Sequence, residues 1–295
     1  MPDIALRLNK DMLVVSAPVE QALARQGVDV DQDMEYMLIN EPEAIRDALN
    51  LENAVGAQCL VTPTASITQA RLAHHYMEND GQTLVNAAKS IANGLKPQHV
   101  LVEIGPCGLP LDPSSEASLK EHRGQYAGAL ELLGTEGYDA VFFNGFTRVE
   151  DLACALDAAN EIGFAAPVFA SVALTDEGGL AHGATLEEAA ACAAERGAAA
   201  FGFETAQGAD DAAALVRRVK AACDLPVMVQ FHVNKLEPKA YEPADDNPYC
   251  RADIMVTASA KVYAAGAQFV RATGAATASY TGALMATVTG LDVKL

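Results

Sequence analysis

The sequence contains no tryptophan, and aromatic residues make up only 6% of its 295 positions. It has no apolar run of the roughly 20 residues that a membrane-spanning helix needs, and residues 1–7 lack the charged-then-apolar pattern of a signal peptide. Twenty basic residues against 39 acidic ones give a net charge of −19, so a phosphate backbone would be repelled. These absences predict a cytoplasmic protein that binds neither membranes nor nucleic acid.

The cysteines form no recognisable pattern. Six are scattered at wide spacing without a C-x-x-C pair, which is unlike a zinc knuckle or a disulfide scaffold. Cys154, Cys192 and Cys223 lie in alanine-rich helical patterns and are expected to be small core hydrophobes. The glycine-rich phosphate-binding signatures G-x-G-x-x-G and G-x-x-x-x-G-K-[ST] are also missing after the candidate strands, which argues against a doubly wound nucleotide-binding sheet.

What the sequence does contain is an alternation of short apolar runs with longer amphipathic ones, the pattern of repeated βα units. Thr185 followed three residues later by Glu188 is typical of a helix start. Eight parallel strands joined by helices favour a single-domain (β/α)8 barrel over residues 1–295, with a doubly wound open sheet as the alternative. The strands are expected at residues 12–16, 58–62, 100–104, 140–144, 168–171, 199–203, 227–231 and 268–272, and helices at 20–26, 43–55, 83–94, 115–135, 149–162, 186–196, 209–222 and 259–265.

Two segments are expected to be functional loops. Residues 105–112 form a Gly- and Pro-containing turn after the third strand, and residues 235–251 form a long polar stretch after the seventh. Both would lie at the C-terminal rim of the barrel, where the active sites of this fold are built. For the second, a solvated connector is the equal alternative.

Local patterns across nearly the whole chain resemble, in order and spacing, those of the homocysteine S-methyltransferase family. That family has a (β/α)8 barrel, which agrees with the strand count. The resemblance rests on residues 12–27, 39–45, 55–64, 104–108, 137–146 and 182–189.

The resemblance also implies a zinc ion held by three cysteine thiolates, which deprotonates and activates the homocysteine sulfur. One thiolate comes from the end of strand six, and two come from a Gly-Gly-Cys-Cys-Gly-Thr motif at the end of strand eight. Here Thr205 stands at the first position, and Ala275 and Ala276 stand at the other two. All three thiolates are therefore missing, and zinc is not expected as a cofactor.

The acids that hold the amino group of homocysteine in the family are replaced as well. The matching positions after strands one and four carry Ser16 and Asn144, which are neutral and would bind an ammonium group less well. Five coordinated replacements in one site indicate a changed specificity rather than an alignment slip.

The expected barrel mouth nevertheless keeps a polar set, which also includes Glu103. Glu204, His232 and Arg271 come from adjacent strands and are predicted to be catalytic, with a carboxylate–imidazole pair for acid/base chemistry and a guanidinium for an anionic ligand. The alternative is that Glu204 and Arg271 form a structural ion pair and that His232 binds a loop carbonyl. The predicted substrate-binding residues are Ser16, Thr62, Asn144, Ser171, Asn234 and Thr273.

A substitute metal site is also conceivable, with His232, Glu204, Cys250 and either Cys107 or Cys59 as ligands. No closely spaced pair of ligands anchors such a site, however.

Three functions stay open at this point. The first is a zinc-independent methyltransferase that moves a methyl group between a small substrate and a carrier such as a corrinoid protein or a folate. The second is a non-catalytic small-molecule-binding barrel, and the third is homocysteine methyl transfer with substitute metal ligands. Barrels of this kind often dimerise through their helices, so a homo-oligomer is also open.

Overall fold

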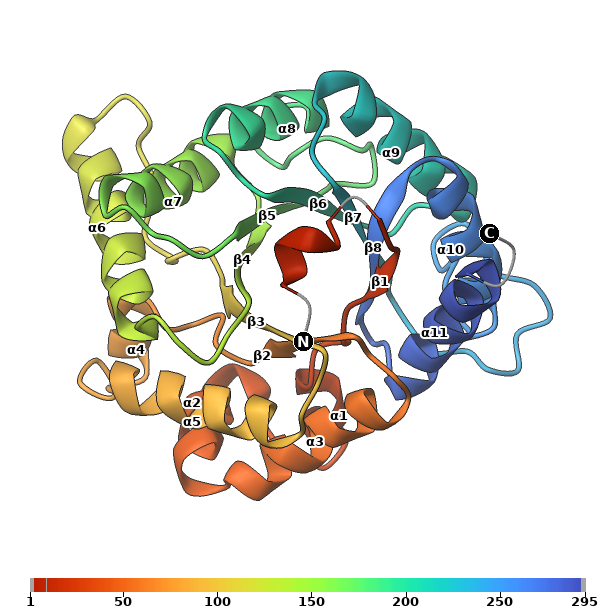
Figure 1. The fold of residues 1–295 in the computed structure, drawn as a ribbon, viewed down its shortest axis with the longest axis horizontal. Helices are drawn as coiled ribbons and strands as arrows, with labels where there is room; N and C mark the ends of the chain where they lie inside the picture. Colours follow the sequence, from red (N-terminus) through yellow and green to blue (C-terminus); the bar gives the residue numbers. More distant parts are fainter. Residues whose placement is uncertain (1–2, 9, 293–295) are drawn as a thin grey trace.

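The computed structural model describes residues 3–8 and 10–292, which form a (β/α)8 barrel (Figure 1). Eight parallel strands lie side by side in the order β1-β8-β7-β6-β5-β4-β3-β2. A parallel bridge between Val15 and Cys59 joins β1 to β2 and closes the ring. The strands are β1 (Leu13–Val14), β2 (Cys59–Thr62), β3 (His99–Ile104), β4 (Ala140–Phe146), β5 (Val168–Ala173), β6 (Ala200–Thr205), β7 (Val227–Val233) and β8 (Ala267–Gly274).

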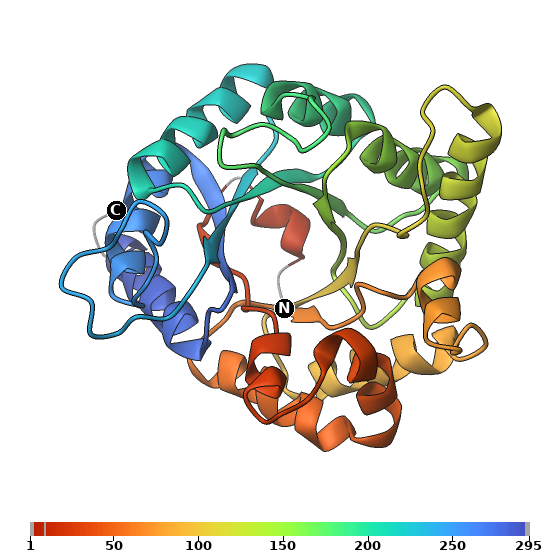
Figure 2. The ribbon, with the colours of Figure 1, turned by 180° about the vertical axis from the view of Figure 1, so that it is seen from behind.

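Helices cover the outside of the strands (Figure 2). The eight predicted strands and eight predicted helices are all present, with shifted ends, and α2, α4 and α11 are additional. Thr185 caps α8 in a capping box with Glu188, as predicted. The helices are α1 (Glu20–Ala24), α2 (Val30–Asn40), α3 (Pro42–Ala54), α4 (Gln69–His74), α5 (Gly81–Gly94), α6 (Glu116–Leu133), α7 (Val149–Glu161), α8 (Leu186–Glu195), α9 (Ala209–Ala222), α10 (Ile254–Ala264) and α11 (Ala278–Asp292).

The barrel interior is apolar toward the N-terminal ends of the strands. Phe142, Phe169 and Phe269 fill it, and Ile4 and Leu8 pack against the same cluster from below. Ile4 belongs to the short 3-10 helix η1 (Ile4–Leu6), which lies over this end of the barrel. The N-terminal end is thereby closed by side chains.

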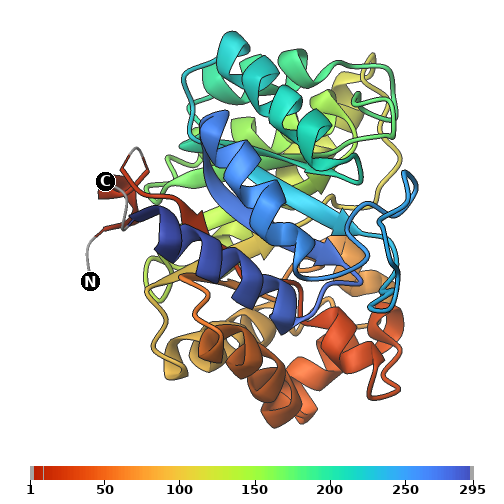
Figure 3. The ribbon, with the colours of Figure 1, turned by 90° about the vertical axis from the view of Figure 1, so that its right-hand side faces the viewer.

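The opposite end carries the loops that follow the strands. Figure 3 shows η1 and the loop after β7, residues 234–253, at opposite ends of the barrel. The two segments that the sequence analysis assigned to the C-terminal rim, 105–112 and 235–251, do follow β3 and β7. Within the part of the chain that the structure describes, no helix has both the length and the apolar character needed to cross a membrane.

Candidate functional site

A carboxylate and an imidazole meet at the mouth of the barrel. Glu204 near the end of β6 and His232 near the end of β7 point into it, with Glu204 Oε1 2.5 Å from His232 Nδ1. Thr273 on β8 donates its hydroxyl hydrogen to the same oxygen at 2.7 Å. The side chain of His232 is 40% exposed and that of Glu204 is 21% exposed, so a ligand can reach the pair.

Glu204 and His232 shift each other's pKa in opposite directions. Burial opposes the ionisation of Glu204, but hydrogen bonds from His232 and Thr273 outweigh it and hold the pKa of Glu204 below its ordinary value. The hydrogen bond to Glu204 raises the pKa of His232, although partial burial works against this rise. Since Nδ1 faces Glu204, the atom of His232 that can exchange a proton with a ligand is Nε2.

Arg271 does not join this pair. Its side chain is 1% exposed and lies inside the barrel, so it does not point to solvent, and its ion-pair partner is Glu103 on β3, with Nη2 3.4 Å from Oε2. The guanidinium also donates to the backbone carbonyl of Ser16 at 2.9 Å and to Gln230 Oε1 at 3.1 Å. The predicted meeting of Arg271 with Glu204 and His232 is therefore replaced by a buried network one layer deeper.

Amides extend this network across the barrel. Asn144 donates to Glu103 Oε1 at 2.6 Å, and Gln230 donates to Asn144 Oδ1 at 2.7 Å and to the hydroxyl of Ser171 at 2.8 Å. Ser171 and Gln230 are fully buried, whereas Asn144 and Glu103 are partly exposed and form the floor of the mouth. Gln230 was not among the predicted site residues, because an amide inside an apolar strand carries no motif.

Ser16 and Thr62, two of the predicted substrate-binding residues, lie elsewhere. Both are fully buried. Leu13, Val15 and Val61 belong to the cluster inside the barrel, and side chains alternate along a strand, so Ser16 and Thr62 face the helices. The hydroxyl of Ser16 accepts a hydrogen bond from the backbone N–H of Val61 at 3.0 Å and so helps to close β1 onto β2.

The rim beside Glu204 and His232 is hollowed. A cavity of about 360 Å³ is lined by both residues and by Asp176 and Asn234. It adjoins a larger cleft of about 830 Å³, which shares Asp176 and Asn234 with it. The predicted substrate-binding residue Asn234 is exposed there. Four carboxylates line the large cleft and none of its described lining residues is basic; the carboxylates belong to Asp176, Asp211, Asp245 and Asp246.

The positions of the expected thiolates do not fit zinc. Thr205 is 1% exposed, and its hydroxyl accepts a hydrogen bond from the backbone N–H of Gln207 at 3.1 Å. Ala276, 2% exposed, and Ala275 offer no side-chain donor atom. A hydroxyl already engaged with the backbone and two methyl groups cannot replace three thiolates.

The substitute metal site is not assembled either. Cys59 lies in the apolar cluster inside the barrel, and Cys250 is a buried residue of the β7–α10 loop. Cys107 contacts His122 instead of His232. Among the residues that the structure describes, only one group of at least three candidate ligands converges, and it contains neither Glu204 nor His232.

Comparison with known proteins places the chain. No curated protein matches the sequence. The homocysteine methyltransferase MmuM from Escherichia coli is similar in structure in its metallated form, with a TM-score of 0.77 at 18% identity over 96% of this chain and 98% of that one. Its apo form gives a TM-score of 0.72 at 17% identity over the same shares.

The carboxyl transferase domain of Rhizobium etli pyruvate carboxylase, in a form with pyruvate, is more distant. Its TM-score is 0.53 at 12% identity, over 91% of this chain and 41% of that one. At such identities these structures support the fold alone. The sequence, in contrast, matches the family model described as Homocysteine S-methyltransferase over residues 14–276. The chain therefore belongs to the homocysteine S-methyltransferase family.

Proposed function

We propose that this protein is a methyltransferase that works without the zinc–thiolate centre and does not use homocysteine in the usual way. Membership of the family supports methyl transfer as the class of reaction. The observation that carries the proposal is the contact of 2.5 Å between Glu204 Oε1 and His232 Nδ1 at the open end of the barrel. In this reaction the neutral form of His232 is the base, and Glu204 holds its ring in place.

The proposed step replaces metal activation of the acceptor by proton removal. The acceptor, a thiol or another X–H group, gives its proton to His232 Nε2, and its lone pair forms the new bond to the methyl carbon. The bond between the methyl group and the donor breaks, and its electron pair leaves with the donor. Glu204 stabilises the imidazolium that forms, much as a buried carboxylate does beside a catalytic histidine.

The charge of the rim favours a cationic methyl donor. Asp176, Asp211, Asp245 and Asp246 line the cleft of about 830 Å³ next to His232. An onium donor is attracted by such a surface and leaves as a neutral molecule, so it needs no Lewis acid on the leaving group.

As the second participant we propose a methyl carrier. A reduced folate offers an N–H group and can be the acceptor in this step, whereas a corrinoid protein can take part only as the methyl donor, because its cobalt has no proton for His232 to remove. Support for it comes from the size of the cleft, since about 830 Å³ is within the usual range for a cofactor-sized ligand such as a folate or the corrinoid group of a carrier protein. Asn144 and Glu103, which form the floor of the mouth, would contact the small substrate.

The test is transfer of a labelled methyl group, with methylcorrinoid, methylfolate, S-adenosylmethionine and simple onium compounds as donors. We expect turnover with at least one of them. The variants Glu204→Gln and His232→Asn should each lower kcat by about 10²–10⁴-fold, the usual contribution of general acid–base catalysis. The matched control is His74→Asn, because His74 is exposed at the end of α4.

Two outcomes would overturn the proposal. One is the absence of transfer from every donor together with retained binding of a small ligand, which would identify a binding protein. The other is stoichiometric zinc that is lost on substitution of His232 and is required for homocysteine methylation, which would restore the metal-dependent reaction.

A further inference from the structure

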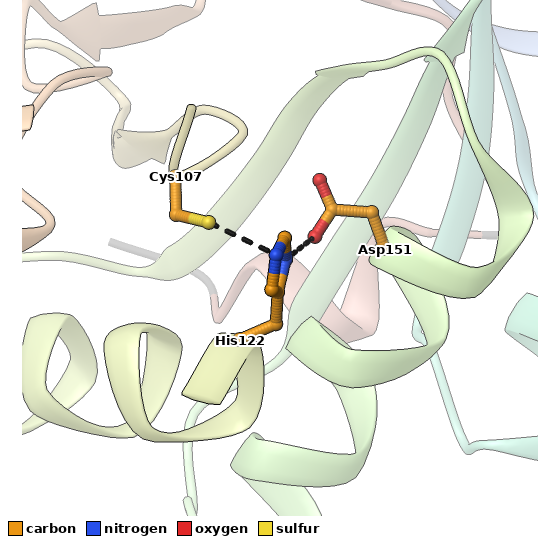
Figure 4. Close-up of side chains that lie close together, drawn as sticks. All are labelled: Cys107, His122 and Asp151. Carbon is orange, nitrogen blue, oxygen red and sulfur yellow. Dashed lines mark hydrogen bonds and ion pairs between the residues drawn. The ribbon is translucent and has the colours of Figure 1, made fainter. Parts of the chain in front are cut away.

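Three side chains of types that bind metals in other proteins converge at the β3–α6 loop (Figure 4), and neither Glu204 nor His232 is among them. Cys107 belongs to that loop, His122 to α6 and Asp151 to the first turn of α7. His122 Nδ1 lies 3.4 Å from the sulfur of Cys107 and 2.8 Å from Asp151 Oδ1. The three ligand atoms all lie within 4.8 Å of one another.

Each of the three residues also makes a further hydrogen bond. His122 Nε2 lies 3.4 Å from the carbonyl oxygen of Pro110. The hydroxyl of Tyr126 donates to Asp151 Oδ1 at 2.8 Å and accepts from the backbone N–H of Cys107 at 3.0 Å. Outer partners of this kind are what orients the ligands in metal sites.

The sulfur has such a partner too. Burial raises the pKa of the Cys107 thiol, and a hydrogen bond from the backbone N–H of Leu109 works in the opposite direction. An N–H group that points at sulfur stabilises a thiolate.

The carbonyl of Pro110 suits one tautomer of the imidazole. A carbonyl oxygen only accepts, so it is a partner for the tautomer with its hydrogen on Nε2, which is the tautomer that binds a metal through Nδ1. Nδ1 then presents a lone pair to two other electron-rich groups, a sulfur and a carboxylate oxygen. Cys107 and His122 are each 1% exposed, so water does not separate these groups, and a positive charge between them would relieve their repulsion.

We propose that Cys107, His122 and Asp151 form a zinc site that fixes the β3–α6 loop to α6 and α7. Thiolate, imidazole and carboxylate together suit Zn²⁺. Tetrahedral zinc places a sulfur and a nitrogen ligand about 3.5 Å apart, and here they are 3.4 Å apart. Asp151 would move outward by about 0.5 Å to reach the matching nitrogen–oxygen separation.

A metal ion can reach the site from solvent at Asp151, since the side chain of Asp151 is 13% exposed. The site lies on the β3–α6 loop, α6 and α7, and so on other elements than the strand-six and strand-eight positions at which the family resemblance implies zinc. It does not depend on the proposed reaction, so the two stand or fall separately.

The deciding experiment uses the unaltered protein. The chain is freed of metal with a chelator and titrated with Zn²⁺ or Co²⁺. We expect one ion per chain by elemental analysis, a thiolate-to-cobalt charge-transfer band, and a higher melting temperature with zinc. Co²⁺ that binds without this band, or no stoichiometric binding, would overturn the proposal and leave the three side chains as a hydrogen-bonded cluster.

Substitutions then assign the ligands. Cys107→Ser should abolish the charge-transfer band, and Asp151→Asn should weaken binding of Zn²⁺. Tyr126→Phe removes only the outer hydrogen bonds and should weaken binding by about 10–100-fold. Cys192→Ser is the matched control, because Cys192 is a buried cysteine of α8 outside the cluster. Equal loss of the band in Cys192→Ser would contradict the assignment.

Discussion

Gly274 lies directly against the imidazole of His232. A Cβ atom at position 274 would lie 2.9 Å from Cε1 and 3.0 Å from Nε2 of His232, and 2.6 Å from the carbonyl oxygen of Val233. The φ angle of Gly274 is also positive, at 61°. The turn after β8 therefore holds the ring edge of His232 in a position that only glycine allows.

Substituting Gly274→Ala should displace His232 from Glu204. We expect a loss of about 1–3 kcal/mol of stability from the backbone conformation alone, a fall in kcat beyond that of the control, and a return of the His232 pKa toward 6.5 in an NMR titration. The matched control is Gly134→Ala, because Gly134 has the same φ of 61° but open space where its Cβ would lie. An unchanged His232 titration in Gly274→Ala would contradict the steric role.

The Glu204–His232 pair should make stability depend on pH. The pKa of His232 is raised from 6.5, so its contribution is complete below pH 6.5 and is lost as the pH rises through the raised value. The pKa of Glu204 is lowered from 4.5, so its contribution is complete above pH 4.5 and is lost as the pH falls through the lowered value.

The two effects together place the largest contribution of this pair to the free energy of unfolding between pH 4.5 and pH 6.5. Urea unfolding of the unaltered protein and of Glu204→Gln should differ most in free energy within that window. A difference that grows steadily above pH 6.5 would show that the pair does not stabilise the charged imidazole in this way.

Arg271→Met should be strongly destabilising. It leaves Glu103 without its ion-pair partner in the interior, and breaking a buried pair from one side costs about 3–5 kcal/mol. The double substitution Arg271→Met with Glu103→Gln should recover part of this loss. Arg218→Met is the control: Arg218 and Glu187 are 40% and 39% exposed, and their pair should contribute at most about 1 kcal/mol. Equal losses in the two arginine variants, measured by denaturant unfolding, would argue against a special role for Arg271.

Returning the thiolates should return a metal at the mouth. In the triple variant Thr205→Cys, Ala275→Cys, Ala276→Cys, we expect one more zinc ion per chain than in the unaltered protein, because the family resemblance places its ligands at these three positions. Elemental analysis in the Cys107→Ser background separates this ion from the one proposed behind the β3–α6 loop. Thr205→Cys alone is the control and should gain no zinc.

The fold was predictable because each buried strand leaves a continuous apolar run. The ends of the strands were less predictable. β6 and β7 extend by two residues past the predicted 203 and 231, since Glu204 and His232 are polar and end the apolar run before the strand itself ends. Three helices were not predicted, namely α2, the short α4 and the alanine- and threonine-rich α11, and the apolar periodicity of α11 is weak.

The candidate site was predictable as far as neighbouring strands determine it. Glu204 and His232 meet because β6 and β7 are adjacent. Arg271 pairs in register with Gln230, and Thr273 with His232, so Arg271 lies one layer too deep to join them. The order of the strands predicts which side chains are neighbours around the barrel, but how deep each side chain lies depends on the register between strands. The contact of Cys107 with His122 spans 15 residues of sequence, and that of His122 with Asp151 spans 29, so no helical spacing indicated them.

Closure of the N-terminal end of the barrel restricts the order in which substrates bind and products leave. Ile4 and Leu8 seal the N-terminal end, and the network around Arg271 fills the interior above the phenylalanines. Substrates and products of a reaction at His232 therefore enter and leave through the C-terminal end of the barrel, past the carboxylates of the cleft. In the proposed reaction the participant that lies deeper has to enter first and leave last, so the order of binding is set by the shape of the protein, and product inhibition should show that order.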